Sequence, residues 1–80
     1  MEVNFLMETN KFIKMDNLQD IKRLASIVSS INGKATITKG NLKINAKSVL
    51  GLLSLDLSHG AKITYPYNEQ LDKFLQPFEF

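Results

Sequence analysis

Four stretches of the chain alternate apolar and polar residues with a period of two. They lie at residues 3–8, 35–38, 42–47 and 61–65. This period, with one apolar face, is typical of strands covered on one side only, so the sequence predicts an antiparallel sheet with its other face in water. Gly40 and Asn41 separate the second and third stretches and predict a two-residue hairpin turn.

Two other segments have the period of a helix. The apolar stripe of the first consists of Leu18, Ile21, Leu24, Ala25, Val28 and Ile31. Asp16 or Asn17 can cap its start, and Asn32-Gly33 fits its end. The second segment covers residues 68–76 and ends at Pro77. Its apolar side consists of Leu71, Phe74 and Leu75.

A third, shorter helix is expected from Val49 to Leu55, with Ser48 as its N-cap. The element order is then β-α-β-β-α-β-α. This order predicts an α+β fold, an open-faced sandwich in which three helices lie on one face of a four-stranded antiparallel sheet. No linker, repeat or low-complexity tract interrupts residues 1–80, so we expect one domain.

Composition narrows the function classes. The chain of 80 residues has no cysteine, so neither a disulfide nor a thiolate metal site is expected. We also expect no cofactor and no enzyme activity. No apolar run approaches the roughly 20 residues of a membrane span, and the start of the chain does not read as a signal peptide, which favours a cytoplasmic protein. The net charge of +2 is small and evenly spread along the sequence, and this argues against direct nucleic-acid binding.

One nine-residue stretch carries a specific resemblance. Residues 47–55 read KSVLGLLSL, and this stretch resembles the motif K-S-[IV]-[ML]-G-[VL]-[ML]-S-L of HPr, the histidine-containing phosphocarrier family of the bacterial sugar phosphotransferase system. The alignment runs without gaps from about Asn17 to Tyr65. The resemblance implies an HPr-like fold.

The chain departs from the family where the family carries phosphate. In the family, a histidine accepts phosphate in the context G-[IL]-H-A-R-P-A. Alignment places Asn17 at the histidine, Gln19 at the arginine and Asp20 at the proline. An amide nitrogen is not a nucleophile, neutral Gln19 cannot pair phosphate as arginine does, and Asp20 adds a repelling charge. We therefore expect no catalytic residue and no phosphohistidine carrier activity.

His59 is the one histidine of the sequence. It is either a relocated phosphoryl acceptor or a surface histidine in the connection between a helix and a strand. No arginine lies near it in sequence, which favours the second interpretation.

The resemblance implies a regulatory role for Ser48. In the Gram-positive branch of the family, an ATP-dependent kinase phosphorylates the corresponding serine, and the product acts as a corepressor for a transcription factor. Capping alone also explains a serine here and contributes about 1 kcal/mol. Phosphate at a helix N-terminus is physically tolerated, so the two roles are compatible.

The short helix has more apolar residues than one buried face requires. We expect Val49, Leu50 and Leu53 to remain exposed and to form a docking surface for another protein. The alternative is that these residues fill the core under the C-terminal helix. Lys22 and Lys47 either border such a surface or are simply solvated.

The sequence therefore predicts an HPr-like regulatory protein-binding module without carrier activity. Its expected partners are proteins, such as an HPr-type serine kinase or a transcription regulator, rather than nucleic acid or membrane. Two alternatives remain: a working carrier with an unorthodox acceptor, and a structural domain that pairs with itself. Phe78 and Phe80 either fold back on the sheet or contact a partner.

Overall fold

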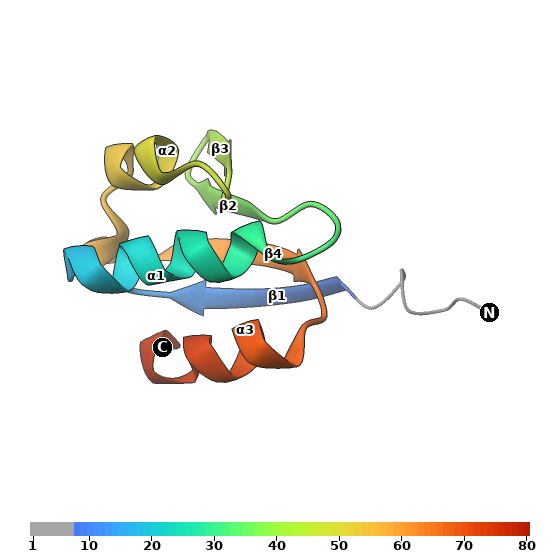
Figure 1. Cartoon of the computed structure of the whole chain (residues 1–80). Helices are drawn as coiled ribbons and strands as arrows, with labels where there is room; N and C mark the ends of the chain where they lie inside the picture. Colours follow the sequence, from blue (N-terminus) through green and yellow to red (C-terminus); the bar gives the residue numbers. More distant parts are fainter. Residues whose placement is uncertain (1–7) are drawn as a thin grey trace.

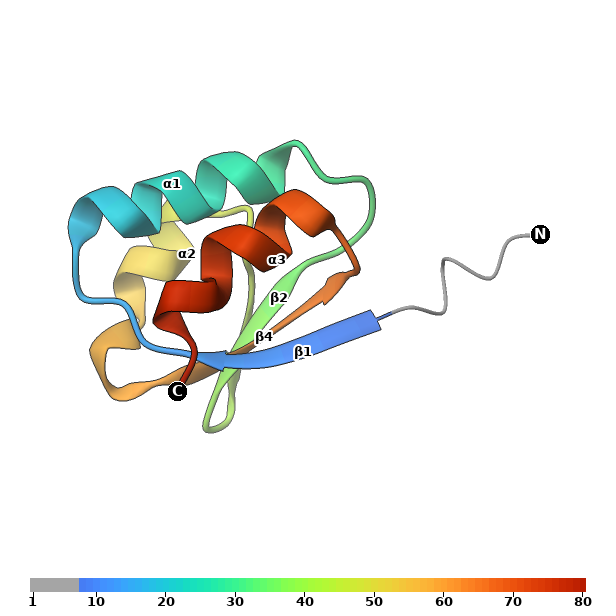
Figure 2. The ribbon, with the colours of Figure 1, turned by 90° about the horizontal axis from the view of Figure 1, so that it is seen from below.

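The computed structural model describes residues 8–80, which form a four-stranded antiparallel sheet with three α-helices on one side (Figures 1 and 2). The strands are β1 (Glu8–Ile13), β2 (Thr36–Lys39), β3 (Leu42–Asn45) and β4 (Ala61–Pro66), in the spatial order β1-β4-β2-β3. The helices are α1 (Leu18–Ser29), α2 (Val49–Ser54) and α3 (Glu69–Leu75), and short 3-10 turns follow at η2 (Leu57–His59) and η3 (Gln76–Phe78). The predicted fold class and element order are confirmed.

The predicted hairpin joins β2 to β3. Thr38 pairs with Lys43 and Lys39 pairs with Leu42, so Gly40 and Asn41 form a two-residue loop. Gly40 has a φ of +60°, which a glycine adopts without steric cost and which hairpin turns of this length require.

The core lies between the sheet and the helices. Strand β4 contributes Ala61, Ile63 and Tyr65, all buried, while Lys62 and Thr64 point to the other face. Helix α1 packs against both α2 and α3 and buries Ile21, Leu24, Ala25 and Val28. Leu18 was also predicted in this stripe, but its side chain is 48% exposed because it occupies the first turn of α1.

The first strand differs from the sequence prediction. The alternating stretch at 3–8 lies outside the described residues except for Glu8, and β1 continues to Ile13. The register pairs Lys11 with the buried Ile63, so Lys11 faces the helices, whereas Phe12 faces outward. A lysine on the covered face and a phenylalanine on the open face reverse the usual pattern, and this is why alternation did not predict that the strand continues to Ile13.

Acidic side chains from the C-terminal region make the inward position of Lys11 tolerable. Its Nζ lies 2.8 Å from Glu79 Oε2 and 3.4 Å from Asp72 Oδ1. The hydrogen bond with Glu79, above all, raises the pKa of Lys11. The hydroxyl of buried Tyr65 donates to the same Asp72 carboxylate at 3.0 Å, and so β1, β4 and α3 share one polar network.

The C-terminal segment folds back on β1. Glu79 forms a bridge with Ile13, and the backbone N–H of Phe80 donates to the carbonyl of Phe12 at 3.3 Å. The Lys14 ammonium lies 4.6 Å from the centroid of the Phe80 ring. Of the two open possibilities for the terminal aromatic residues, the fold-back is therefore the one observed, although the Phe80 side chain remains 65% exposed.

Candidate functional site

Asn17 caps the start of helix α1. Its backbone is extended, with φ −99° and ψ 123°, and its Oδ1 accepts a hydrogen bond from the Gln19 N–H at 2.8 Å. The side-chain oxygen thus satisfies one of the N–H groups that every helix start leaves free. Gln19 is exposed and Asp20 is half-buried in the first turn, where its charge suits the helix dipole. Of the two predicted caps, Asn17 is the one used.

Ser48 caps α2, as the sequence predicts. Its Oγ accepts from the Gly51 N–H at 3.1 Å, and the residue is exposed. Gly51 allows this helix to approach the sheet, because a Cβ atom there would lie 3.2 Å from Ile44 Cδ1 and 3.3 Å from Ser48 Oγ. Ser48 is therefore an exposed residue whose hydroxyl is at the same time part of the helix start.

The leucines of α2 divide into two sets. Leu52 is fully buried and Leu55, which follows the helix, is 6% exposed. Leu50 is 81% exposed, Leu53 43% and Val49 38%, so the exposure expected for these three side chains is observed. We call Val49, Leu50 and Leu53 the α2 patch. Helix α2 lies beside α1 in both views (Figures 1 and 2), so the helix that carries the patch belongs to the helical side of the sheet.

The two lysines expected near this patch have different surroundings. Lys47 is half-buried, and its Nζ donates to the carbonyl of Ile31 at 3.1 Å. This bond ties the start of α2 to the segment after α1, and it gives Lys47 a structural role. Lys22 is an exposed residue of α1.

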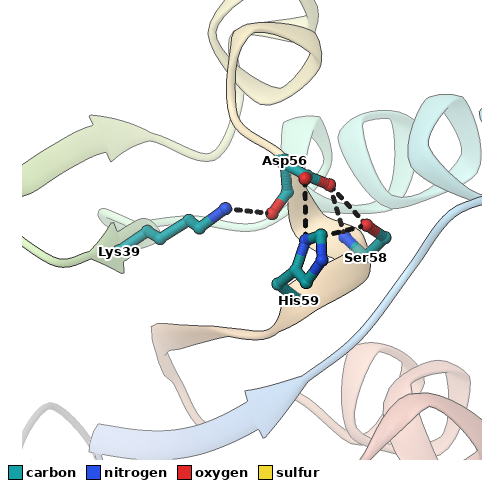
Figure 3. Close-up of polar contacts among 4 residues, drawn as sticks. All are labelled: Lys39, Asp56, Ser58 and His59. Carbon is teal, nitrogen blue, oxygen red and sulfur yellow. Dashed lines mark hydrogen bonds and ion pairs between the residues drawn. The ribbon is translucent and has the colours of Figure 1, made fainter.

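His59 belongs to a small polar cluster around η2 (Figure 3). Its Nδ1 lies 2.8 Å from Asp56 Oδ2, while Asp56 Oδ1 accepts hydrogen bonds from both the backbone N–H and the hydroxyl of Ser58. Lys39 donates from Nζ to the carbonyl of Asp56. The bonds from Ser58 and then the contact with His59 lower the pKa of the Asp56 carboxyl to about 2.

This cluster has a simple structural explanation, because Asp56 is the N-cap of η2. Sequence reasoning considered His59 alone and missed Asp56 and Lys39. An aspartate three residues before the histidine was the available signal for the first. The second could not be found in this way, because Lys39 reaches the cluster from the end of β2.

No group of three or more histidine, cysteine, aspartate or glutamate side chains within residues 8–80 could hold a metal ion. In the same part of the chain, no helix is both long and apolar enough to cross a membrane.

The protein belongs to the class of open-faced α/β sandwiches, and its second helix is capped by a serine. Comparison of the sequence with known protein families identifies the family. Residues 19–69 match the family described as the PTS HPr component phosphorylation site. The chain therefore belongs to the HPr family of the phosphotransferase system. The match includes Ser48 and α2 and begins two residues after Asn17.

Solved structures show the same fold. The phosphocarrier protein HPr from Bacillus anthracis superposes with a TM-score of 0.66 at 18% identity, covering 86% of this chain and 98% of that one. HPr-C-His from Thermoanaerobacter tengcongensis superposes with a TM-score of 0.62 at 25% identity, covering 85% and 84% of the two chains. No curated protein sequence matches the chain.

Proposed function

We propose that this HPr family member is a regulatory protein-binding module without phosphohistidine carrier activity. The single observation that carries the proposal is the α2 patch, in which Leu50 is 81% exposed on a helix that also holds the fully buried Leu52. A large aliphatic side chain gains nothing from that position in the isolated domain, whereas it would bury apolar surface against a partner.

The start of α1 supports the absence of carrier activity. The Asn17 oxygen is engaged as a helix cap, and its amide nitrogen is conjugated with the carbonyl and cannot attack phosphorus. Gln19 is neutral and cannot form the charge-assisted, two-pronged contact with phosphate that an arginine supplies. These residues oppose phosphoryl transfer at this end of the helix.

Ser48 is the proposed switch for docking. A phosphate on its exposed Oγ would add close to two negative charges beside Val49, at a helix start where free N–H groups favour anions. A kinase of the type that phosphorylates serine in HPr proteins is the proposed enzyme, and a transcription regulator is the proposed reader of the modified form. The proposed place of action is the cytoplasm.

The test uses intact mass after incubation with ATP and an HPr serine kinase. We expect the wild-type protein to gain one phosphate and Ser48→Ala to gain none. Leu50→Lys should slow the reaction at least tenfold if the kinase docks on the α2 patch. Leu42→Lys is the matched control, because Leu42 is 58% exposed on β3, outside the patch. Failure of wild type to react, or equal slowing by both lysine variants, would contradict the proposal.

The Asp56–His59 pair favours a second candidate, a carrier that uses His59. Asp56 Oδ2 at 2.8 Å holds Nδ1 in its protonated form, which leaves the lone pair of Nε2 available to attack phosphorus. The histidine side chain is 77% exposed. Incubation with phosphoenolpyruvate and the first enzyme of the phosphotransferase system distinguishes the candidates. Acid-labile phosphate on wild type but not on His59→Ala would favour the carrier, whereas its absence supports the regulatory module.

A further inference from the structure

The face of the sheet opposite the helices is uncovered within residues 8–80 (Figure 2). Residues directly opposite each other on neighbouring strands point to the same face, so the register identifies what lies there. One row across the sheet consists of Phe12, Lys62, Thr38 and Lys43. The next consists of Asn10, Thr64, Thr36 and Asn45. We call these two rows the open face.

A shallow hollow of about 460 Å³ lies over this face, and its rim is cationic. Lys34, Lys43 and Lys62 line it, against one acid, Glu8. None of these three lysines takes part in an ion pair among the described residues, where the paired lysines are Lys11 and Lys73. The small net charge of the chain therefore hides an uneven distribution, since acids such as Asp20 and Asp72 lie on the helical side.

The floor of the hollow is hydrogen-bonding rather than apolar. Thr36, Thr38 and Thr64 line it with Asn10, and the Thr64 hydroxyl donates to Asn10 Oδ1 at 2.6 Å. That bond uses the amide oxygen, and the amide N–H groups of Asn10 donate to no other residue in the range 8–80. Hydroxyl and amide groups of this kind bind the edges of bases and the hydroxyls of sugars.

An aromatic ring, that of Phe12, lies at the β1 end of the row that holds Lys62, outside the lining of the hollow. Phe12 is 58% exposed and is paired across β1 and β4 with Lys62. An exposed ring beside ammonium groups on a flat sheet suits stacked bases joined by phosphates, because stacking uses the ring and the phosphates use the lysines. An acidic peptide would use the lysines alone and would leave the ring in water.

We propose that the open face binds single-stranded nucleic acid. Phe12 offers one ring for a stacked base, and Lys34, Lys43 and Lys62, which form no ion pair with other residues of the described part of the chain, are placed to meet the adjoining phosphates. The expectation against nucleic acid rested on net charge, which averages over both faces of the molecule. This inference does not depend on the proposed function, since the α2 patch and Ser48 belong to the helical side.

The experiment measures fluorescence anisotropy of a fluorescein-labelled octa-uridylate at several salt concentrations. With three lysines in contact, the logarithm of the binding constant should fall with the logarithm of salt with a slope of about −2. The double variant Lys43→Gln, Lys62→Gln should weaken binding and reduce the slope to about −0.7. Phe12→Leu should weaken binding roughly fivefold or more without changing the slope.

Lys73→Gln is the matched control, because it removes one positive charge from α3 on the helical side. It should leave the affinity for octa-uridylate within about twofold of wild type. Circular dichroism confirms that each variant is folded, and none of the four substituted side chains belongs to the core.

Three results would overturn the proposal. The first is no binding of octa-uridylate at low salt. The second is an equal loss of affinity in Lys73→Gln and the open-face variants, which would indicate attraction to overall charge. The third is binding of an octaglutamate peptide with at least the affinity of the RNA and no effect of Phe12→Leu, which would make the open face a site for acidic peptides.

Discussion

Phe80 lies so close to Gly60 that a Cβ atom at Gly60 would be 2.6 Å from Phe80 Cζ. Gly60 has a φ of +99°, where side chains are strained, and it immediately precedes β4. The contact joins the turn after η2 to the last described residue. The absence of a side chain at Gly60 therefore leaves room for the Phe80 ring.

We predict that Gly60→Ala destabilises the protein by about 2 kcal/mol, chiefly from backbone strain at φ +99° and ψ 143°, because the exposed Phe80 ring can turn aside. Gly40→Ala is the matched control, because Gly40 also has a positive φ, +60°, but a Cβ atom there would meet nothing within 4 Å. The control should cost about 1 kcal/mol. Urea unfolding measures both, and an equal cost would contradict the larger backbone strain expected at Gly60.

Replacing a buried and an exposed leucine of α2 by alanine should have different effects on the free energy of unfolding. Leu52→Ala should cost about 2–5 kcal/mol of unfolding free energy, because it leaves a cavity at a fully buried position. Leu50→Ala should change it by no more than about 0.5 kcal/mol, because the side chain is 81% exposed. Chemical denaturation of both variants provides the measurement. A large loss in Leu50→Ala would place this side chain in the core and remove the main support for docking.

Because Ser48 caps α2, the loss of stability should depend on which residue replaces it. Ser48→Ala should cost about 1 kcal/mol because the Gly51 N–H loses its acceptor, whereas Ser48→Gly should cost only a few tenths of that amount. Ser54→Ala provides a control at the other end of α2, where the hydroxyl donates to the Gly51 carbonyl from an exposed position. Thermal unfolding of the three variants distinguishes capping from a general effect of losing a hydroxyl.

The lowered pKa of the Asp56 carboxyl makes the stability of the protein depend on pH in the acid range. Its pKa is lowered in the folded protein, from 3.8 to about 2, so the carboxylate stabilises the fold above pH 4 and that contribution disappears as the pH falls through 2. Asp56→Asn keeps a good helix cap but removes the charge, so the variant should lose less stability than wild type between pH 4 and pH 2. Unfolding in urea at pH 6, 4 and 2.5 measures the difference.

Asp16→Asn serves as the control for this titration, since Asp16 is exposed and lies outside the η2 cluster. A change in stability that both variants share would come from the loss of an exposed charge and not from the η2 cluster. If the pH dependence of Asp56→Asn follows that of wild type, the hydrogen bonds from Ser58 and His59 do not favour the carboxylate.

Local signals in the sequence predicted most of the fold. The Gly40-Asn41 turn, the cap at Ser48 and the alternation of β4 each depend on near neighbours, and all three are observed. The extent of strand β1 to Ile13 was not predicted because its inward Lys11 is compensated by Glu79, a residue 68 positions away. No pattern confined to one segment reports such a partner.

The same limit applies to the candidate site. The excess of leucines on α2 was enough to predict which three would be exposed, because a short helix can bury only one side. The bond from Lys47 to the Ile31 carbonyl was not predictable, since it joins two loops that only the packing of α1 and α2 brings together. The charge of the open face was also hidden, because its lysines come from separate segments.

The bridge between Glu79 and Ile13 has a consequence for the behaviour of the sheet at high concentration. A sheet grows by adding strands at its edges, and β1 and β3 are the two edges here. The returning segment occupies backbone groups of β1 at Phe12 and Ile13, while β3 is only four residues long and carries Lys43. Within residues 8–80 the uncovered part of each edge is short, and this disfavours the edge-to-edge aggregation to which open sheets are prone.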